Sequence, residues 1–377
     1  MTSRESEASV TSTRTYVASA QERQPIKIGW LGTPWDRFKR EIALPFEDGM
    51  ARGLFDRPYE FLFEAETGLP LGTAKDSVDA FHRLVDAGCI VIAGANYSDT
   101  AMILAEYANE AKVPLISWCG TERFQGQYCF RLGNGDVGCE PALMVSWLKR
   151  NGYRTVAVVS SYSPIGEEYF RYFRQECRRM NLSVAAVEPV SMATSDLAAT
   201  LDKLRHANAH ALVWLGYGGL ALTGAVREAL DRLGWDPPRI MSTAFMQYLF
   251  GFEKFEGWVG IDQWCPKNRR TQQFHERFVA RYGESPAQWP NAIPGLSYDT
   301  AAVIVEGLHR ATVMSGWGVK EGIERIRFMP SATGGPNTHI AGGPYDHQLF
   351  KGDWLNYGRV RNGNLEFVGT YEPTDDY

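Results

Sequence analysis

The chain has 377 residues, of which 44% are hydrophobic, so it can bury a large core and is long enough for two domains of ordinary size. Its formal net charge is -5, which supplies no basic field, so nucleic acid is a poor partner. The longest apolar stretches fall well short of the roughly 20 residues that a membrane-spanning helix needs, so we predict a globular protein that does not span a membrane.

The first 25 residues differ in composition from the rest of the chain. They are rich in Ser, Thr, Glu and Arg and contain no apolar stretch of the kind that a secretory signal needs. We therefore expect residues 1–25 to form a disordered tail. With the N-terminus as written, this tail predicts a cytoplasmic protein.

From residue 26 the chain alternates strands and helices. Two short apolar runs, at residues 90–93 and 114–117, lack polar alternation, which is typical of parallel strands covered on both faces. Between them, apolar residues recur at helical spacing from Ala101 to Ala111. The pattern predicts a first doubly wound sheet with strands at 26–31, 59–64, 90–93 and 114–117 and with helices at 37–53, at 74–87 and between the last two strands.

Two polar turns follow the ends of these buried strands, at residues 94–98 and 118–121. Open α/β sheets bind ligands at the carboxyl ends of their strands, so we look for function there first. Ser98 or Asp99 stands where a helix N-cap belongs. The neighbouring backbone N–H groups could therefore receive an anion or a carbonyl group.

A second strand and helix series of similar plan follows an extended segment at residues 128–132. It predicts strands at 155–160, 184–187, 211–215 and 239–243 and helices at 141–150, 167–180, 197–207 and 220–233. Another extended segment at 257–262 precedes helices at 270–282, 298–312 and 320–327 and a closing hairpin at 354–370. Two lobes joined by extended crossings imply hinge closure on a ligand, but the fold alone does not decide between binding and catalysis.

Aromatic residues stand in the turns that should face the cleft between the lobes. An apolar wall with a few polar groups describes a small-molecule pocket, so we predict a ligand with an apolar or aromatic body and a carboxylate or amide end. The alternative is that several of these side chains only pack under loops. The candidates are Trp35, Tyr97 and Trp118 in the first lobe and Tyr162, Tyr217, Phe245 and Tyr248 in the second.

The sequence carries no clear signal of catalysis or metal binding. The six cysteines show no CxxC spacing, and the HExxH spacing is missing, so we expect no metal and no cofactor. Cys119 could be a nucleophile, which would make the protein a hydrolase. The glycine pattern of a nucleophile elbow is missing around Cys119, so this hydrolase is a remote alternative and we predict no catalytic residue.

Several segments in a fixed order resemble type I periplasmic binding proteins, and in particular the branch that receives branched-chain amino acids, amides and urea for ABC transporters. The segments are KIGWLG, GANYSDTAMILAEYANEAKVPLIS, CFRLGNGD, TVAVVSSYSPIGEEYF, ALVWLGYGG and GRVRNGNLEFVG. The resemblance covers about residues 26–373. It implies two doubly wound Rossmann-like lobes joined by a three-strand hinge, with lobe 1 at 26–127 plus 262–344 and lobe 2 at 128–261 plus 345–377.

The resemblance also implies ligand contacts. In this family a Ser after the third strand and a small residue plus a Thr after the fourth hold a carboxylate or amide, and here those positions look like Ser98, Cys119 and Thr121. The second lobe often adds a Tyr before a Gly, where this chain has Ile165. Members that bind amino acids use an acidic residue where this chain has Ala244-Phe245-Met246, so no acid stands ready for an ammonium group.

The function that the resemblance implies is non-enzymatic solute binding followed by presentation of the ligand to an ABC permease. By resemblance the protein would lie in the periplasm or cell envelope, if the start of the chain is truncated. The alternative is a cytoplasmic ligand sensor of the amide-binding type, whose closure controls a regulatory protein.

Overall fold

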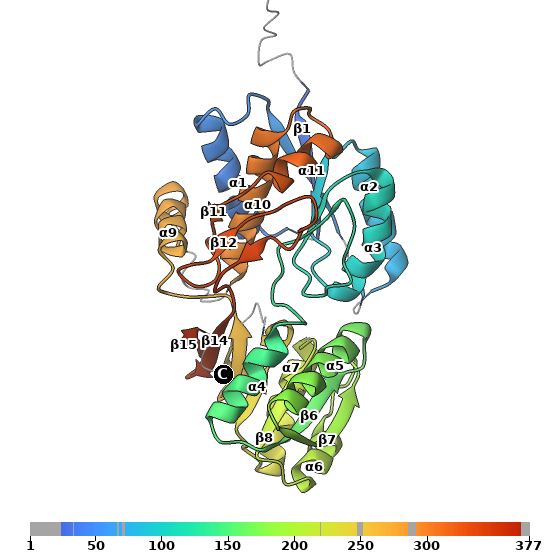
Figure 1. Cartoon of the computed structure of the whole chain (residues 1–377), viewed down its shortest axis with the longest axis vertical. Coiled ribbons are helices and arrows are strands. Elements are labelled where there is room, and N and C mark those ends of the chain that lie inside the picture. The colour runs from blue at the N-terminus through green and yellow to red at the C-terminus, as the bar shows by residue number, and fades with distance from the viewer. Residues whose placement is uncertain are drawn as a thin grey trace, which may run out of the picture.

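The computed structural model describes residues 24–32, 34–65, 68–69, 72–218, 220–246, 252–285 and 292–370. The chain forms two α/β lobes, which lie one above the other in Figure 1. Each lobe is a sheet with helices against it. This architecture confirms the predicted fold class of two Rossmann-like lobes.

The first lobe is built on a five-stranded parallel sheet in the order β2-β1-β3-β4-β5. Its strands are β1 (Ile26–Leu31), β2 (Tyr59–Glu64), β3 (Val91–Ala93), β4 (Leu115–Ser117) and β5 (Cys129–Arg131). Strands β3 and β4 are buried at every residue, because helices cover both faces of the sheet. These helices are α2 (Ala74–Asp86) and α3 (Ser98–Ala111) on one face and α1 (Asp36–Ala51), α10 (Ile293–Arg310) and α11 (Gly316–Glu324) on the other.

The second lobe contains a seven-stranded sheet in the order β15-β14-β10-β9-β8-β6-β7. The strands from β6 to β10 pair in parallel, whereas β14 and β15 add an antiparallel edge. The strands are β6 (Thr155–Ser161), β7 (Ser183–Val190), β8 (Ala211–Leu215), β9 (Arg239–Met241), β10 (Val259–Asp262), β14 (Asn356–Arg361) and β15 (Asn364–Thr370). The helices of this lobe are α4 (Glu140–Arg150), α5 (Pro164–Arg179), α6 (Ala198–His206), α7 (Leu220–Leu233) and the short α8 (Thr243–Met246).

Three crossings within the described chain join the lobes. They run from β5 to α4, from β10 to α9 (Arg269–Tyr282), and from β13 (Phe350–Lys351) to β14 (Figure 1). The strands β11 (Met329–Pro330) and β12 (His339–Ile340) form a small antiparallel sheet with β13. The backbone N–H of Arg131 in β5 donates to the carbonyl of His347 at 2.8 Å, so the strand before the first crossing is tied to the segment that precedes β13.

Helices α5, α10 and α11 begin well before the residues at which the hydrophobic pattern predicts them to start. Helix α5 begins at Pro164, because the hydroxyl of Ser163 accepts the backbone N–H of Gly166 and Pro164 suits the first helical turn. Helix α11 begins at Gly316 with the same kind of Ser cap, and α10 begins at Ile293 with Pro294 in its first turn. Apolar periodicity locates the buried stretch of a helix, whereas its first turn is set by the cap.

None of the helices in the described ranges is long and apolar enough to cross a membrane. All six cysteines lie within those ranges as free thiols, five buried and Cys139 exposed. The cysteines therefore add no crosslink to the fold.

Candidate functional site

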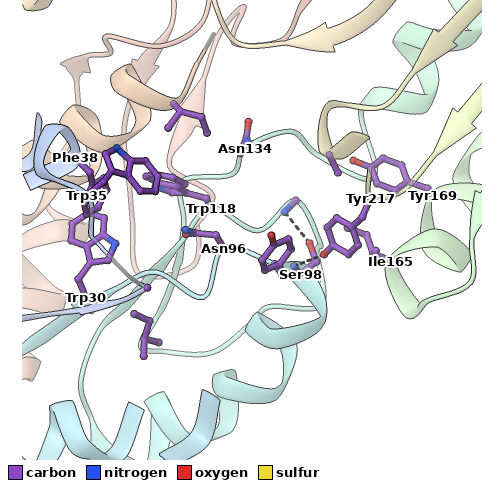
Figure 2. A pocket seen from close by; sticks show the side chains of 16 residues that line it. Trp30, Trp35, Phe38, Asn96, Ser98, Trp118, Asn134, Ile165, Tyr169 and Tyr217 are labelled. Atoms are coloured by element: carbon purple, nitrogen blue, oxygen red, sulfur yellow. Dashed lines mark hydrogen bonds between the residues drawn. The ribbon is translucent and has the colours of Figure 1, made fainter. Parts of the chain in front are cut away.

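A cavity of about 390 Å³ lies between the two lobes, and both contribute to its wall. Seven of the 16 lining residues are aromatic, and their rings come from strands, turns and helices (Figure 2). The aromatic residues are Trp30, Trp35, Phe38, Tyr97 and Trp118 from the first lobe and Tyr169 and Tyr217 from the second. An apolar wall of this size suits a small organic molecule with a ring or branched body.

The first-lobe wall follows from the order of its strands. Parallel strands bring their carboxyl ends to one edge of the sheet, so the turn after β1, with Trp35, meets the turn after β3, with Tyr97 and Ser98. Trp118 follows β4, and its indole N–H donates to Thr300 Oγ1 on α10 at 2.8 Å. The ring of Trp118 is thereby fixed and contributes apolar surface to the cavity.

Tyr217 reaches the cavity from the turn after β8. Gly216 has a φ of +114°, and a Cβ at that position would meet Ser161 Oγ at 2.2 Å, so only glycine fits the turn. The hydroxyl of Ser161 accepts the backbone N–H of Tyr217 at 3.0 Å. This contact orients Tyr217 toward the first lobe.

The lobes touch directly across the cleft. The backbone N–H of Ser98 donates to the Tyr217 hydroxyl at 2.7 Å, as Figure 2 shows. The backbone N–H of Ile165 on α5 donates to Asp99 Oδ1 at 3.1 Å, and Thr121 Oγ1 donates to Glu168 Oε2 on α5 at 2.8 Å. Such contacts between lobes mark the structure as a closed form of a two-lobed protein.

No Asp, Glu, Lys, Arg or His belongs to the described residues that line the cavity. Charged groups stand behind the wall. Burial raises the pKa of Asp99 to about 6, although the hydrogen bond from Ile165 N and the charge of Arg123 act in the opposite direction. Burial likewise raises the pKa of Glu140 to about 7, and the carboxylate of Glu140 accepts the hydroxyl of Tyr169 at 2.9 Å.

The structure brings half of the sequence-predicted site residues to the cavity. Trp35, Tyr97, Ser98, Trp118 and Tyr217 line it. The other predicted residues do not, or lie where nothing is described. Cys119 and Thr121 are fully buried beneath the wall, Tyr162 is 75% exposed outside it, the side chain of Phe245 is not described, and Tyr248 lies outside the described residues.

Several other residues line the cavity although no sequence pattern marked them as ligand contacts. Trp30 and Phe38 look like ordinary core residues of a strand and a helix, and Tyr169 lies on the apolar face of α5. Asn134 lies on the first crossing, and its Oδ1 has no hydrogen-bond partner among the described residues. The sequence GNGD at residues 133–136 is typical of a break in regular structure, but it gives no sign that this segment lies beside the cavity.

Cys119 is poorly suited to nucleophilic chemistry. Its side chain is buried, and burial raises the pKa of its thiol to about 11, so little thiolate forms near neutral pH. Within the described ranges, no group of three or more His, Cys, Asp and Glu side chains could hold a metal ion. The site is therefore arranged for enclosing a molecule by apolar contact and hydrogen bonding.

Comparison with known proteins agrees with this architecture. The family model described as "Periplasmic binding protein" matches residues 70–355. No curated protein matches the chain by sequence.

Solved structures share the fold at low sequence identity. A type 1 periplasmic binding protein from Bordetella pertussis Tohama I has 17% identity and a TM-score of 0.77, over 92% of this chain and 100% of that one. A branched-chain amino acid transporter substrate binding protein from Streptococcus pneumoniae, in complex with isoleucine, has 18% identity and a TM-score of 0.75, over 93% and 100%. A solute binding protein of an ABC transporter from Rhodopseudomonas palustris BisB5, in complex with 3,4-dihydroxybenzoic acid, has 16% identity and a TM-score of 0.74, over 93% and 99%.

Proposed function

This chain belongs to the periplasmic binding protein family, and from that premise we propose that it is a solute-binding protein that closes its two lobes on a small organic ligand and delivers it to an ABC transporter. The observation that carries the proposal is the cavity of about 390 Å³ between the lobes, with both lobes in its wall and direct hydrogen bonds across the cleft. A closed form that buries its ligand gives a transporter a shape to recognise.

We propose that the ligand has an apolar or aromatic body and a carboxylate or amide end. The seven aromatic side chains of the wall are the evidence for an apolar or aromatic ligand body, because aromatic rings bury large apolar areas and stack on flat ligands. Ala244 lines the cavity, and it belongs to the stretch Ala244-Phe245-Met246, where the resemblance places the acid of amino acid-binding members, so an ammonium group would find no acidic partner there. The structural neighbour that binds 3,4-dihydroxybenzoic acid illustrates an aromatic ligand in the same fold.

We propose binding without catalysis, in the periplasm or cell envelope where the family works. Two observations support the absence of catalysis: the thiol of Cys119 is buried with a raised pKa, and no charged side chain lines the described cavity wall. General acid or base chemistry needs a titratable group within reach of the reacting atoms.

Native mass spectrometry of the purified protein, followed by denaturation and identification of released compounds, tests the proposal. A thermal-shift panel of aromatic acids, aliphatic and aromatic amides and branched amino acids accompanies it. A ligand that binds only the folded state raises its stability by RT ln(1 + [L]/Kd), so a true ligand shifts the unfolding temperature in a concentration-dependent way. The absence of any released compound and of any shift across the panel would count against solute binding.

A further inference from the structure

The N-terminus of α3 is the strongest potential anion-binding position in the cleft. The first backbone N–H groups of a helix have no partner within the helix, and the helix dipole adds a partial positive charge there. Helix α3 spans 14 residues, and the side chain of its N-cap residue, Tyr97, makes no capping hydrogen bond. A ligand carboxylate entering the cavity would be drawn to this end of the helix.

In this chain the second lobe already occupies that position. The hydroxyl of Tyr217 accepts the backbone N–H of Ser98 at 2.7 Å, and the hydroxyl of Ser98 accepts the backbone N–H of Gly120 at 3.2 Å. Burial, together with the nearby carboxyl of Asp99, raises the pKa of Tyr217 well above its ordinary value, although the hydrogen bonds from Ser98 act against this. The group at the start of α3 is therefore a neutral hydroxyl.

The surroundings also disfavour a carboxylate. The buried carboxyl groups of Asp99 and Glu168 lie directly behind the Ser98 turn, and each bridges the lobes. No cationic side chain lines the described wall. An ionised carboxylate placed here would lose its hydration and be repelled by these acids, and Arg123, whose charge acts on Asp99, does not line the described wall.

We propose that Tyr217 is the specificity-determining residue of the cleft: its hydroxyl takes the place of a ligand carboxylate at α3, so the closed protein accepts an uncharged solute and rejects carboxylates and amino acids. This inference rests on the proposed solute binding. Of the two polar groups proposed for the ligand, a carboxylate or an amide, it selects the amide. Asn96 and Asn134 line the same cavity, and a carboxamide offers both a donor and an acceptor to a neutral polar ligand. The selectivity is therefore a property of this chain's own residues.

The test compares the wild-type protein with Tyr217→Phe and, as matched control, Tyr169→Phe. Tyr169 also lines the cavity, but its hydroxyl binds Glu140, so removing it leaves the start of α3 occupied. Matched pairs of neutral and anionic probes, benzamide with benzoate and isobutyramide with isobutyrate, are titrated by thermal shift and calorimetry. Acetate is titrated separately at constant ionic strength, as a small anion that fits the space left by the lost hydroxyl.

For the wild type we expect amides to bind at least about tenfold more tightly than their carboxylates, and for Tyr217→Phe we expect that preference to shrink by about tenfold. We also expect acetate to stabilise Tyr217→Phe and neither of the other two proteins. A wild type that binds a carboxylate as tightly as its amide overturns the inference and leaves solute binding intact. If no probe pair binds to any of the proteins, the result counts against the proposed solute binding. The acetate titration then still tests Tyr217, because an equal response in all three proteins overturns its proposed role.

Discussion

Trp35 offers the cleanest test of the cavity at the scale of a single residue. It lines the cavity but is 47% exposed, so its removal should weaken ligand contact without emptying the core. We expect Trp35→Ala to reduce affinity for the solute found by mass spectrometry by about ten- to a hundredfold, in line with the loss of an aromatic contact of 1.5–3 kcal/mol. Calorimetric titration measures the change.

Trp317 supplies the matched control for this experiment. It is 48% exposed on α11, away from the cavity, so Trp317→Ala removes the same side chain at the same exposure. Affinity should stay at the wild-type value. Equal losses in the two variants would show that Trp35 acts through general stability and not through ligand contact.

Asp299 shows at the same scale what sequence patterns miss. Its carboxyl is buried and accepts hydrogen bonds from Ser331 Oγ at 2.6 Å and from the backbone N–H groups of Ala332 and Thr333 at 2.8 and 3.1 Å. Residues 331–333 lie more than 30 positions further along the chain, so no local spacing could reveal the contact.

We expect Asp299→Ala to destabilise the protein by about 3 kcal/mol or more, because it leaves buried backbone N–H groups without acceptors. Glu306→Ala on the same helix is the control. Glu306 forms a partly exposed i,i+4 ion pair with Arg310, so its loss should change stability by less than about 1 kcal/mol. Urea unfolding of both variants checks the difference, and equal midpoints would contradict the buried role of Asp299.

At the scale of elements, helices α10 and α11 pack closely through two glycines. A Cβ on Gly322 of α11 would lie 2.0 Å from the backbone carbonyl oxygen of Gly307 on α10, which cannot move without shifting the helix. We therefore expect Gly322→Ala to destabilise the protein by about 2 kcal/mol or more through overpacking. Thermal unfolding measures the effect.

Gly224 is the matched helical control. It lies inside α7, and a Cβ there would meet only the flexible end of Lys254 at 3.6 Å. Gly224→Ala should stabilise the protein by about 0.5–1 kcal/mol, since alanine is the better helix former. Two substitutions of the same kind thus have opposite expected signs, and a shared sign would contradict the packing of α10 against α11.

Elements were more predictable than the site that they build. The strand positions followed from buried apolar runs, and placing candidate residues in the turns after strands brought Trp35, Ser98, Trp118 and Tyr217 to one cavity. The position of Thr121 outside the cavity wall was not predictable in this way, because its hydroxyl donates to Glu168 on the other lobe. Patterns along the chain report local structure, whereas partners across a cleft depend on how the lobes close.

At the scale of the whole molecule, closure of the lobes should depend on pH. Asp99 is buried between the lobes in the closed form, where its pKa rises to about 6, with desolvation the largest cause and the charge of Glu168 adding to it. In an open form, water would reach the carboxyl and its pKa would fall toward the ordinary value of about 3.9. Closing therefore takes up a proton between these values, and the closed form gains stability as pH falls from about 6 to about 4.

We expect the ligand-free protein to be more compact at about pH 5 than at about pH 7.5, with the closed-to-open ratio changing by up to about a hundredfold over the full titration of a group whose pKa moves by roughly two units. Small-angle X-ray scattering measures the radius of gyration at both values. Asp99→Asn keeps an acceptor for the N–H of Ile165 but cannot titrate, so its radius should no longer respond to Asp99 ionisation. Glu140 is also buried, but it lies within one lobe, where it accepts the backbone N–H of Thr243. Its titration should therefore affect the stability of the wild type and of Asp99→Asn equally. A wild type that expands on acidification, or a variant that keeps the full pH response, would show that Asp99 does not couple protons to closure.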